Sequence, residues 1–152
     1  MPYNVPLYTS SVPPPVSFDA QVTTPARVAP VLSGIVRYGG LILLVLGMVM
    51  WTGTVDILVP IHMLIGILVV LALWALAGVF LMSEKGGLPL ALGAFAVGLA
   101  QALLGLTQAQ ILPTTGHWVI QVAHLLLGVI LIGLGEMMTM RMKKARVAVA
   151  AR

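Results

Sequence analysis

The sequence predicts an all-α integral membrane protein, built as an up-down bundle of four transmembrane helices. Of its 152 residues, 60% are apolar and only 8% are charged, whereas a soluble domain carries about 25% charged residues. Four continuously apolar stretches lie at about 35–54, 58–82, 87–112 and 116–140, and each is long enough to cross the hydrocarbon core as a helix. The strands of a membrane β-barrel would instead alternate apolar and polar residues.

Short runs of turn-forming residues separate these stretches, so consecutive helices are expected to be antiparallel. All basic residues then fall on one side of the bundle; they are Arg27, Arg37, Lys85, Arg141, Lys143, Lys144, Arg146 and Arg152. Because basic residues favour the cytoplasmic side, both termini are predicted to be cytoplasmic, in a bacterial-type plasma membrane. This asymmetry accounts for the net charge of +4 without a nucleic-acid partner, and the basic cluster after the last helix can contact anionic membrane lipid.

The two ends of the chain differ in composition from the membrane domain, which we place at 32–142. Residues 1–31 hold seven of the ten prolines and are predicted to form a disordered, Pro-rich cytoplasmic tail. This tail is either a solvated leader or a segment that docks on a partner subunit, and it lacks the features of a signal peptide. Residues 143–152 are predicted to form a basic cytoplasmic tail.

Few residues are available for chemistry. The chain has no cysteine, which excludes disulfides, iron–sulfur clusters, zinc–thiolate sites and thiol catalysis. Its three histidines are His62, His117 and His124. At 1.5 Å per residue, His62 lies roughly 6 Å into the second helix and His124 roughly 12 Å into the fourth, both counted from the outer face. Since these helices are diagonal neighbours in a square bundle, the two imidazoles can approach each other across its core.

A glycine follows each of these two histidines by four residues. Gly66 follows His62 and Gly128 follows His124, and residues four apart share a helix face. Each glycine removes the side chain beside an imidazole and makes room for a flat group. Iron porphyrin takes axial imidazoles in an apolar slot. We therefore predict a haem b with His62 and His124 as metal ligands and with Gly66 and Gly128 beside it.

Other interpretations of the polar residues are open. A transmembrane histidine can simply hydrogen-bond to a neighbouring helix. His117 is a surface residue at the interface, a partner for a haem propionate, or the true ligand in place of His124. Gln101 and Gln121 bind propionates or a quinone head group, or form interhelical hydrogen bonds. Glu136 belongs to an interfacial charge pair or to a proton relay.

Several short motifs are shared with a known family. They are IHMLIG at 61–66, LAQALLGLT at 99–107, Leu-Pro at 112–113 and HLLLG at 124–128. Together they resemble one four-helix half of the haem A synthase family, over about residues 38–140. Members of that family consist of two fused halves, each with a histidine pair in its second and fourth helices near the outer face. The resemblance implies that His62 and His124 bind haem.

The sequence departs from this family where catalysis is concerned. In the family, a glutamate and often a cysteine pair lie on the first outer loop, where this chain offers Asp56 and no cysteine. One half also provides one haem site, whereas the synthase uses separate cofactor and substrate sites, so no catalytic residue is assigned. Two copies can mimic the fused protein if small residues permit close contact between helices. These residues are Gly93, Val97 and Gly98 of the third helix, or Gly39, Gly40 and Gly47 of the first.

The sequence therefore favours a small membrane cytochrome b that carries one bis-histidine haem near the outer face. Its expected role is electron transfer, as a carrier or complex subunit more than as an enzyme. Expected partners are other membrane redox subunits, a second copy in a homodimer, or a quinone. The alternatives are a haem-modifying enzyme like haem A synthase, and a cofactor-free scaffold or assembly subunit of a membrane complex.

Overall fold

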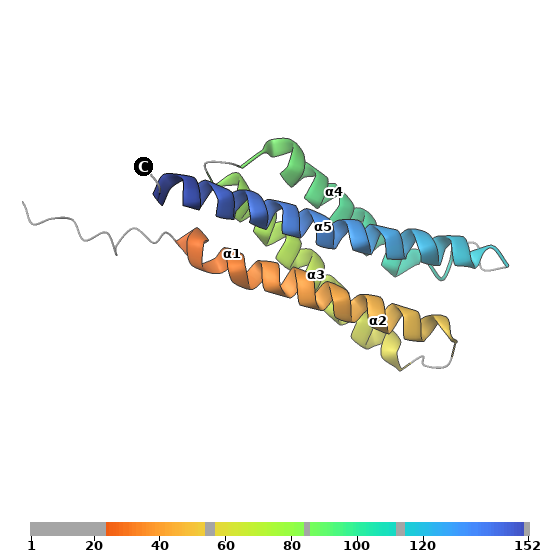
Figure 1. Cartoon of the computed structure of the whole chain (residues 1–152). Coiled ribbons are helices and arrows are strands. Elements are labelled where there is room, and N and C mark those ends of the chain that lie inside the picture. The colour runs from red at the N-terminus through yellow and green to blue at the C-terminus, as the bar shows by residue number, and fades with distance from the viewer. Residues whose placement is uncertain (1–23, 54–56, 84–85, 112–114, 151–152) are drawn as a thin grey trace, which may run out of the picture.

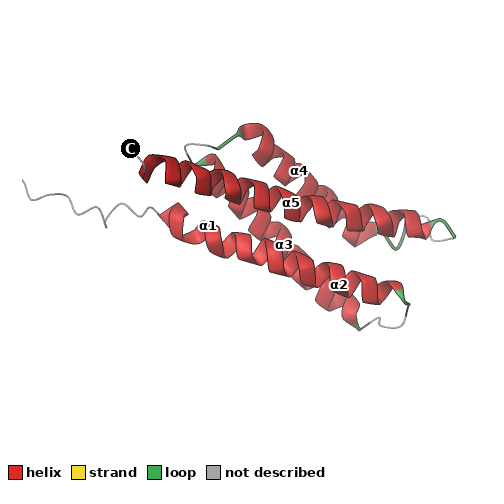
Figure 2. Ribbon diagram, viewed as in Figure 1, coloured by secondary structure: helices red, strands yellow, loops and turns green. Residues whose placement is uncertain are grey.

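The computed structural model describes residues 24–53, 57–83, 86–111 and 115–150. Within these ranges every regular element is a helix (Figure 2). The elements are α1 (Thr24–Gly34), the π-helix η2 (Ile35–Gly39), α2 (Gly40–Trp51), α3 (Leu58–Leu81), α4 (Leu88–Thr107) and α5 (His117–Ala150). Because α1, η2 and α2 follow one another without a break, they form one long rod, and the bundle has four rods (Figure 1).

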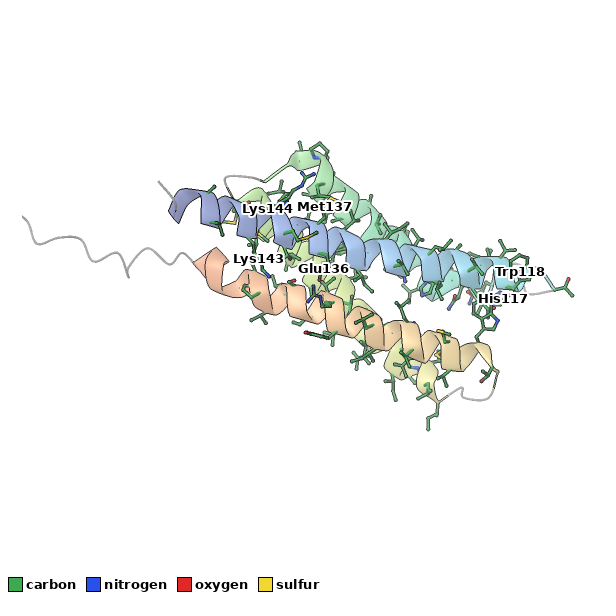
Figure 3. The ribbon with its side chains drawn as sticks, in the orientation of Figure 1. His117, Trp118, Glu136, Met137, Lys143 and Lys144 are labelled. Atoms are coloured by element: carbon green, nitrogen blue, oxygen red, sulfur yellow. The ribbon has the colours of Figure 1, made fainter. Side chains whose placement is uncertain are left out.

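Four segments are long and apolar enough to cross a membrane: Val28–Trp51, Leu58–Leu81, Leu88–Thr107 and His117–Ala145. The predicted all-helical class and its four long apolar helices are thereby confirmed, and they indicate a multi-pass membrane protein. The beginning of α1 and the end of α5 lie at the same end of the bundle (Figure 1). We call this the basic end, because Lys143 and Lys144 lie toward it, and we call the opposite end, marked by His117 and Trp118, the histidine end (Figure 3).

The first rod begins earlier than the sequence analysis suggested. Thr24 opens α1, so residues 24–31 are helical, although they were expected to belong to the extended tail. Pro25 follows Thr24, and proline is tolerated in the first helical turn because its missing N–H would have no helical partner there. The remainder of the expected tail, 1–23, lies outside the described residues.

The last rod exceeds its predicted length. α5 runs for 34 residues to Ala150, roughly 50 Å at 1.5 Å per residue, and it includes most of the basic tail expected at 143–152. The reason lies in the composition, since no glycine or proline follows Gly135 and Ala, Met, Lys and Arg all favour helix. α4 is shorter than predicted and ends at Thr107.

An ion pair ties the first rod to α5. Arg37, in the π-helix η2, donates from Nε and Nη2 to Oε1 and Oε2 of Glu136 at 2.7 and 2.6 Å. This two-pronged geometry is the strong arrangement of a guanidinium and a carboxylate. Of the two interpretations of Glu136, the structure has the charge pair, with a partner 99 residues away in the sequence.

The two halves of the bundle are packed differently. The largest fully buried side chains are Val36, Leu73, Leu76, Phe80 and Met138. Toward the histidine end, the last buried residues on the four rods are Gly40, Val69, Gly98 and Leu131. Beyond these positions no described residue is buried. The core therefore fills the basic half, while the histidine half encloses space.

Candidate cofactor site

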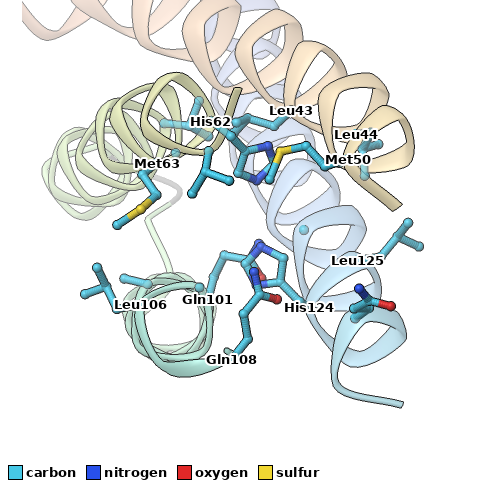
Figure 4. Close-up of a pocket in the computed structure, with 18 of the residues that line it drawn as sticks. Leu43, Leu44, Met50, His62, Met63, Gln101, Leu106, Gln108, His124 and Leu125 are labelled. Atoms are coloured by element: carbon cyan, nitrogen blue, oxygen red, sulfur yellow. The ribbon is translucent and has the colours of Figure 1, made fainter. Parts of the chain in front are cut away.

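A cavity of about 410 Å³ occupies the histidine half of the bundle (Figure 4). It is bounded by residues of α2, α3, α4 and α5, and most of its wall is apolar. Protein interiors are normally close-packed, whereas ligand sites are clefts of roughly 300–1,000 Å³. The hollow therefore has the size and character of a ligand site. All seven residues predicted to surround a cofactor line it: His62, Gly66, Gln101, His117, Gln121, His124 and Gly128.

His62 on α3 and His124 on α5 face each other across this cavity (Figure 4). Their ring centres lie 6.3 Å apart, and the ring planes are inclined by 44°. The two residues come from the second and fourth rods, as the sequence analysis expected. The structure thus places His124 opposite His62, while His117 lies at the end of the cavity where α5 begins.

Each imidazole rests against a glycine of the preceding helix. A Cβ atom at Gly47 of α2 would lie 3.6 Å from Cε1 of His62, and one at Gly105 of α4 would lie 3.1 Å from Cε1 of His124. The two helical hairpins, α2–α3 and α4–α5, therefore contribute the same pair of features, a histidine and the glycine behind it. The sequence analysis missed this role because it considered only glycines on the histidines' own helices.

The two imidazoles differ in their hydrogen bonds. Nε2 of Gln101, on α4, lies 3.2 Å from Nε2 of His124. An amide nitrogen can only donate, so Nε2 of His124 accepts and carries no proton. The amide also lies against Gly128 of α5, where a Cβ would be in van der Waals contact with Nε2 of Gln101, at 3.5 Å. Of the roles weighed for Gln101, the interhelical hydrogen bond is the one found in the structure.

Three buried polar atoms beside the cavity have no hydrogen-bond partner in the described part of the chain. They are Nδ1 of His62, Nδ1 of His124 and Oε1 of Gln101. Buried polar groups are nearly always satisfied by protein, water or a ligand. These are therefore the atoms that bound water or a ligand in the cavity would satisfy.

Polar side chains gather where the cavity reaches the histidine end. Nδ1 of His117 donates to the backbone oxygen of Ile111 at 3.2 Å. His117 also lines the cavity, together with Gln121 and with Gln108, which the sequence analysis did not assign to the site. This end can hydrogen-bond a polar or anionic group of a ligand whose apolar body lies deeper.

The cavity also reaches the apolar surface of the bundle between α3 and α4. Met63 and Ile67 of α3 line the cavity but are 38% and 48% exposed, and Leu106 of α4 lines it and is 55% exposed. Met63 and Leu106 face each other across the opening (Figure 4). A ligand can therefore enter from the hydrocarbon phase without crossing a polar surface.

Three of the glycines considered for contact between two copies pack inside one chain. A Cβ at Gly39 would lie 2.7 Å from Val69, and one at Gly98 would lie 2.5 Å from Nε1 of Trp74. Gly40 meets a side chain of α5 in the same way. These three glycines therefore allow the rods of a single chain to approach closely, whereas a Cβ at Gly93 meets nothing within 4 Å; contact between two copies stays a prediction.

The donor set separates the possible metals. In the part of the chain that the structure describes, no three His, Asp or Glu side chains gather around a common point. Zinc sites use at least three protein ligands, whereas a haem iron needs only axial ligands from the protein. Asp56 and the Leu-Pro turn at 112–113 lie outside the described residues.

Comparisons of the chain with family models, with curated proteins and with solved structures find no match. The resemblance to haem A synthases therefore rests on the motif residues alone, and function has to be argued from the geometry of the cavity.

Proposed function

We propose that the chain is a small membrane cytochrome b, which binds one haem between His62 and His124 and transfers single electrons. The supporting observation is a pair of imidazoles whose ring centres are 6.3 Å apart across an apolar cavity. An imidazole nitrogen bonds a transition metal at about 2.0 Å and lies about 1.1 Å from its ring centre, so two axial imidazoles place their ring centres roughly 6 Å apart. The residues present therefore fit this cofactor.

The chain's own residues would define how the site works. When bound, the haem supplies a ferric–ferrous couple whose potential depends on its axial ligands and on the polarity around it. With both His62 and His124 bound to the metal, no position would be open to a substrate, which favours electron transfer. The side chains of Leu43, Leu44 and Leu125 contribute to the apolar wall and keep water from the deep part of the cavity.

The polar end of the cavity suits the carboxylates of a haem. His117, Gln108 and Gln121 are the residues that offer hydrogen bonds there. Under the positive-inside rule, the basic end faces the cytoplasm of a bacterial-type cell and the haem lies near the outer face. Its redox partner is then a membrane subunit, or a quinone that reaches the opening between α3 and α4 through the lipid.

The test is a reduced-minus-oxidised optical spectrum of detergent-purified protein. We expect a b-type α-band with one haem per chain, and its loss in both His62→Ala and His124→Ala. His117→Ala serves as the matched control, because it removes a third cavity-lining histidine but neither of the facing pair, and it should keep the band. Circular dichroism of each variant separates loss of haem from loss of fold.

The proposal fails if the helical wild-type protein takes up no haem, which would favour the cofactor-free scaffold. It fails in part if the band survives in His124→Ala and disappears in His117→Ala, since the ligand on α5 would then be the wrong histidine. A chemically modified haem released on turnover would favour the haem-modifying enzyme.

A further inference from the structure

The two histidine sites are built alike except at one position. Gly47 of α2 lies behind His62, and Gly105 of α4 lies behind His124. The residue four positions before each of these glycines also lines the cavity. That residue is Leu43 in α2 and Gln101 in α4. Residues four apart share a helix face. Leu43 therefore occupies the position beside His62 that Gln101 occupies beside His124. Only the second imidazole has a polar side chain at this position.

We propose that Gln101 is a positioning residue, which holds His124 in the tautomer able to bind metal and is displaced when the cofactor binds. This inference rests on the proposed haem site. The amide of Gln101 donates to Nε2 of His124 at 3.2 Å, which leaves the proton on Nδ1 and an electron pair on Nε2. Metals bond the unprotonated nitrogen of a neutral imidazole. The amide therefore occupies the electron pair that an iron would take.

The space around the amide supports this assignment. Gln101 lies against both His124 and Gly128, and a Cβ at 128 would be in van der Waals contact with its Nε2 atom, at 3.5 Å. Oε1 of the same amide is buried and has no partner in the described part of the chain. The side chain is therefore held by a single hydrogen bond, and breaking that bond is enough to release it.

An order of ligation follows from the difference between the two sites. A metal that bonds to His62 breaks no hydrogen bond of the kind that Gln101 makes, because Leu43 offers none. A metal that bonds to His124 must first displace Gln101. His62 would therefore hold the cofactor first, and His124 would join it once Gln101 has moved away.

The first experiment uses the cofactor-free full-length protein labelled with 15N-histidine. The chain has three histidines, so the ring nitrogens can be assigned from single substitutions. We expect His124 to show one tautomer, with its proton on Nδ1, and His62 to show a mixture. Gln101→Leu should turn the His124 signal into a mixture, and Leu43→Gln should bring His62 to a single tautomer.

The second experiment measures haem binding by the same variants. A protein hydrogen bond contributes enough that its loss changes an equilibrium constant by roughly 2- to 13-fold. Gln101→Leu removes this bond but lets the His124 ring spread over two tautomers, which costs roughly 2-fold. It should therefore bind haem up to about 6-fold more tightly, and Leu43→Gln should bind it more weakly by up to a similar factor. Leu44→Gln is the control for a new amide in the cavity, because Leu44 points toward Gly128 of α5, and it should leave the His62 tautomers unchanged.

The outcomes separate this inference from the proposed function. If Gln101→Leu leaves the tautomer of His124 unchanged, or weakens haem binding, the role of Gln101 is refuted while the haem site stands. If no variant binds haem although His124 keeps a single tautomer that depends on Gln101, the proposed function is refuted and displacement by a cofactor falls with it. Single tautomers at both histidines in the wild-type protein would refute the order of ligation.

Discussion

Filling the cavity from one glycine should block the cofactor without unfolding the bundle. Gly66 of α3 lines the cavity, and a Cβ placed there meets no other atom within 4 Å. Gly66→Leu adds four carbon atoms, or roughly 100 Å³ of close-packed volume, at the wall of the cavity. Overpacking of this kind costs about 1–3 kcal/mol, so haem affinity should fall roughly 5- to 150-fold. Haem titration of the detergent-purified variant measures the change.

Gly78→Leu is the matched control for this substitution. Gly78 lies on the same helix, has a similar exposed surface and also has nothing within 4 Å of its Cβ position, but it does not line the cavity. Both substitutions gain the same helix propensity, up to about 1 kcal/mol, so any difference in haem binding comes from the cavity. If folded Gly66→Leu binds haem as tightly as Gly78→Leu, the cavity is not the haem site.

Two further predictions concern the contacts between rods. Gly98→Ala places a methyl group 2.5 Å from Nε1 of Trp74 and should lower the free energy of unfolding by about 1–3 kcal/mol. The control Gly93→Ala meets nothing within 4 Å and should leave this free energy unchanged or raise it. Equal unfolding curves of the two variants in mixed detergent would contradict this packing. Glu136→Arg sets two guanidinium groups against each other and should lower Tm, measured by circular dichroism in detergent at low salt. The double variant Arg37→Glu with Glu136→Arg exchanges the two charges and should recover part of the loss. A double variant no more stable than Glu136→Arg would show that the pair does not couple the rods.

Much of the candidate site can be predicted from the sequence, because the position of its histidines depends on distance along the helices. The rise of 1.5 Å per residue places His62 and His124 at similar distances from one end of antiparallel rods. The four-residue spacing to glycine places both histidines beside free space. Together these rules indicated a cavity with two imidazoles before any coordinates were considered, and the structure has such a cavity.

Contacts that depend on the rotation of each helix about its axis cannot be predicted from the sequence. Gly105 behind His124 and the bond from Gln101 to that ring come from the neighbouring helix. Arg37 meets Glu136 across 99 residues of sequence. α3 and α4 are apolar on every side, so their sequence pattern does not distinguish the side that faces lipid from the side that faces the bundle.

Composition and local spacing by themselves determined that the chain forms four apolar helices and that two histidines lie at comparable depth near one end. Both properties follow from hydrophobicity and from the fixed rise of an α-helix, which require no knowledge of neighbours. The tertiary structure decided which side of each rod faces inward, and hence that the basic half is filled while the histidine half is hollow. In a membrane, lipid solvates every apolar face equally well, so close packing between rods makes that choice where hydrophobicity cannot.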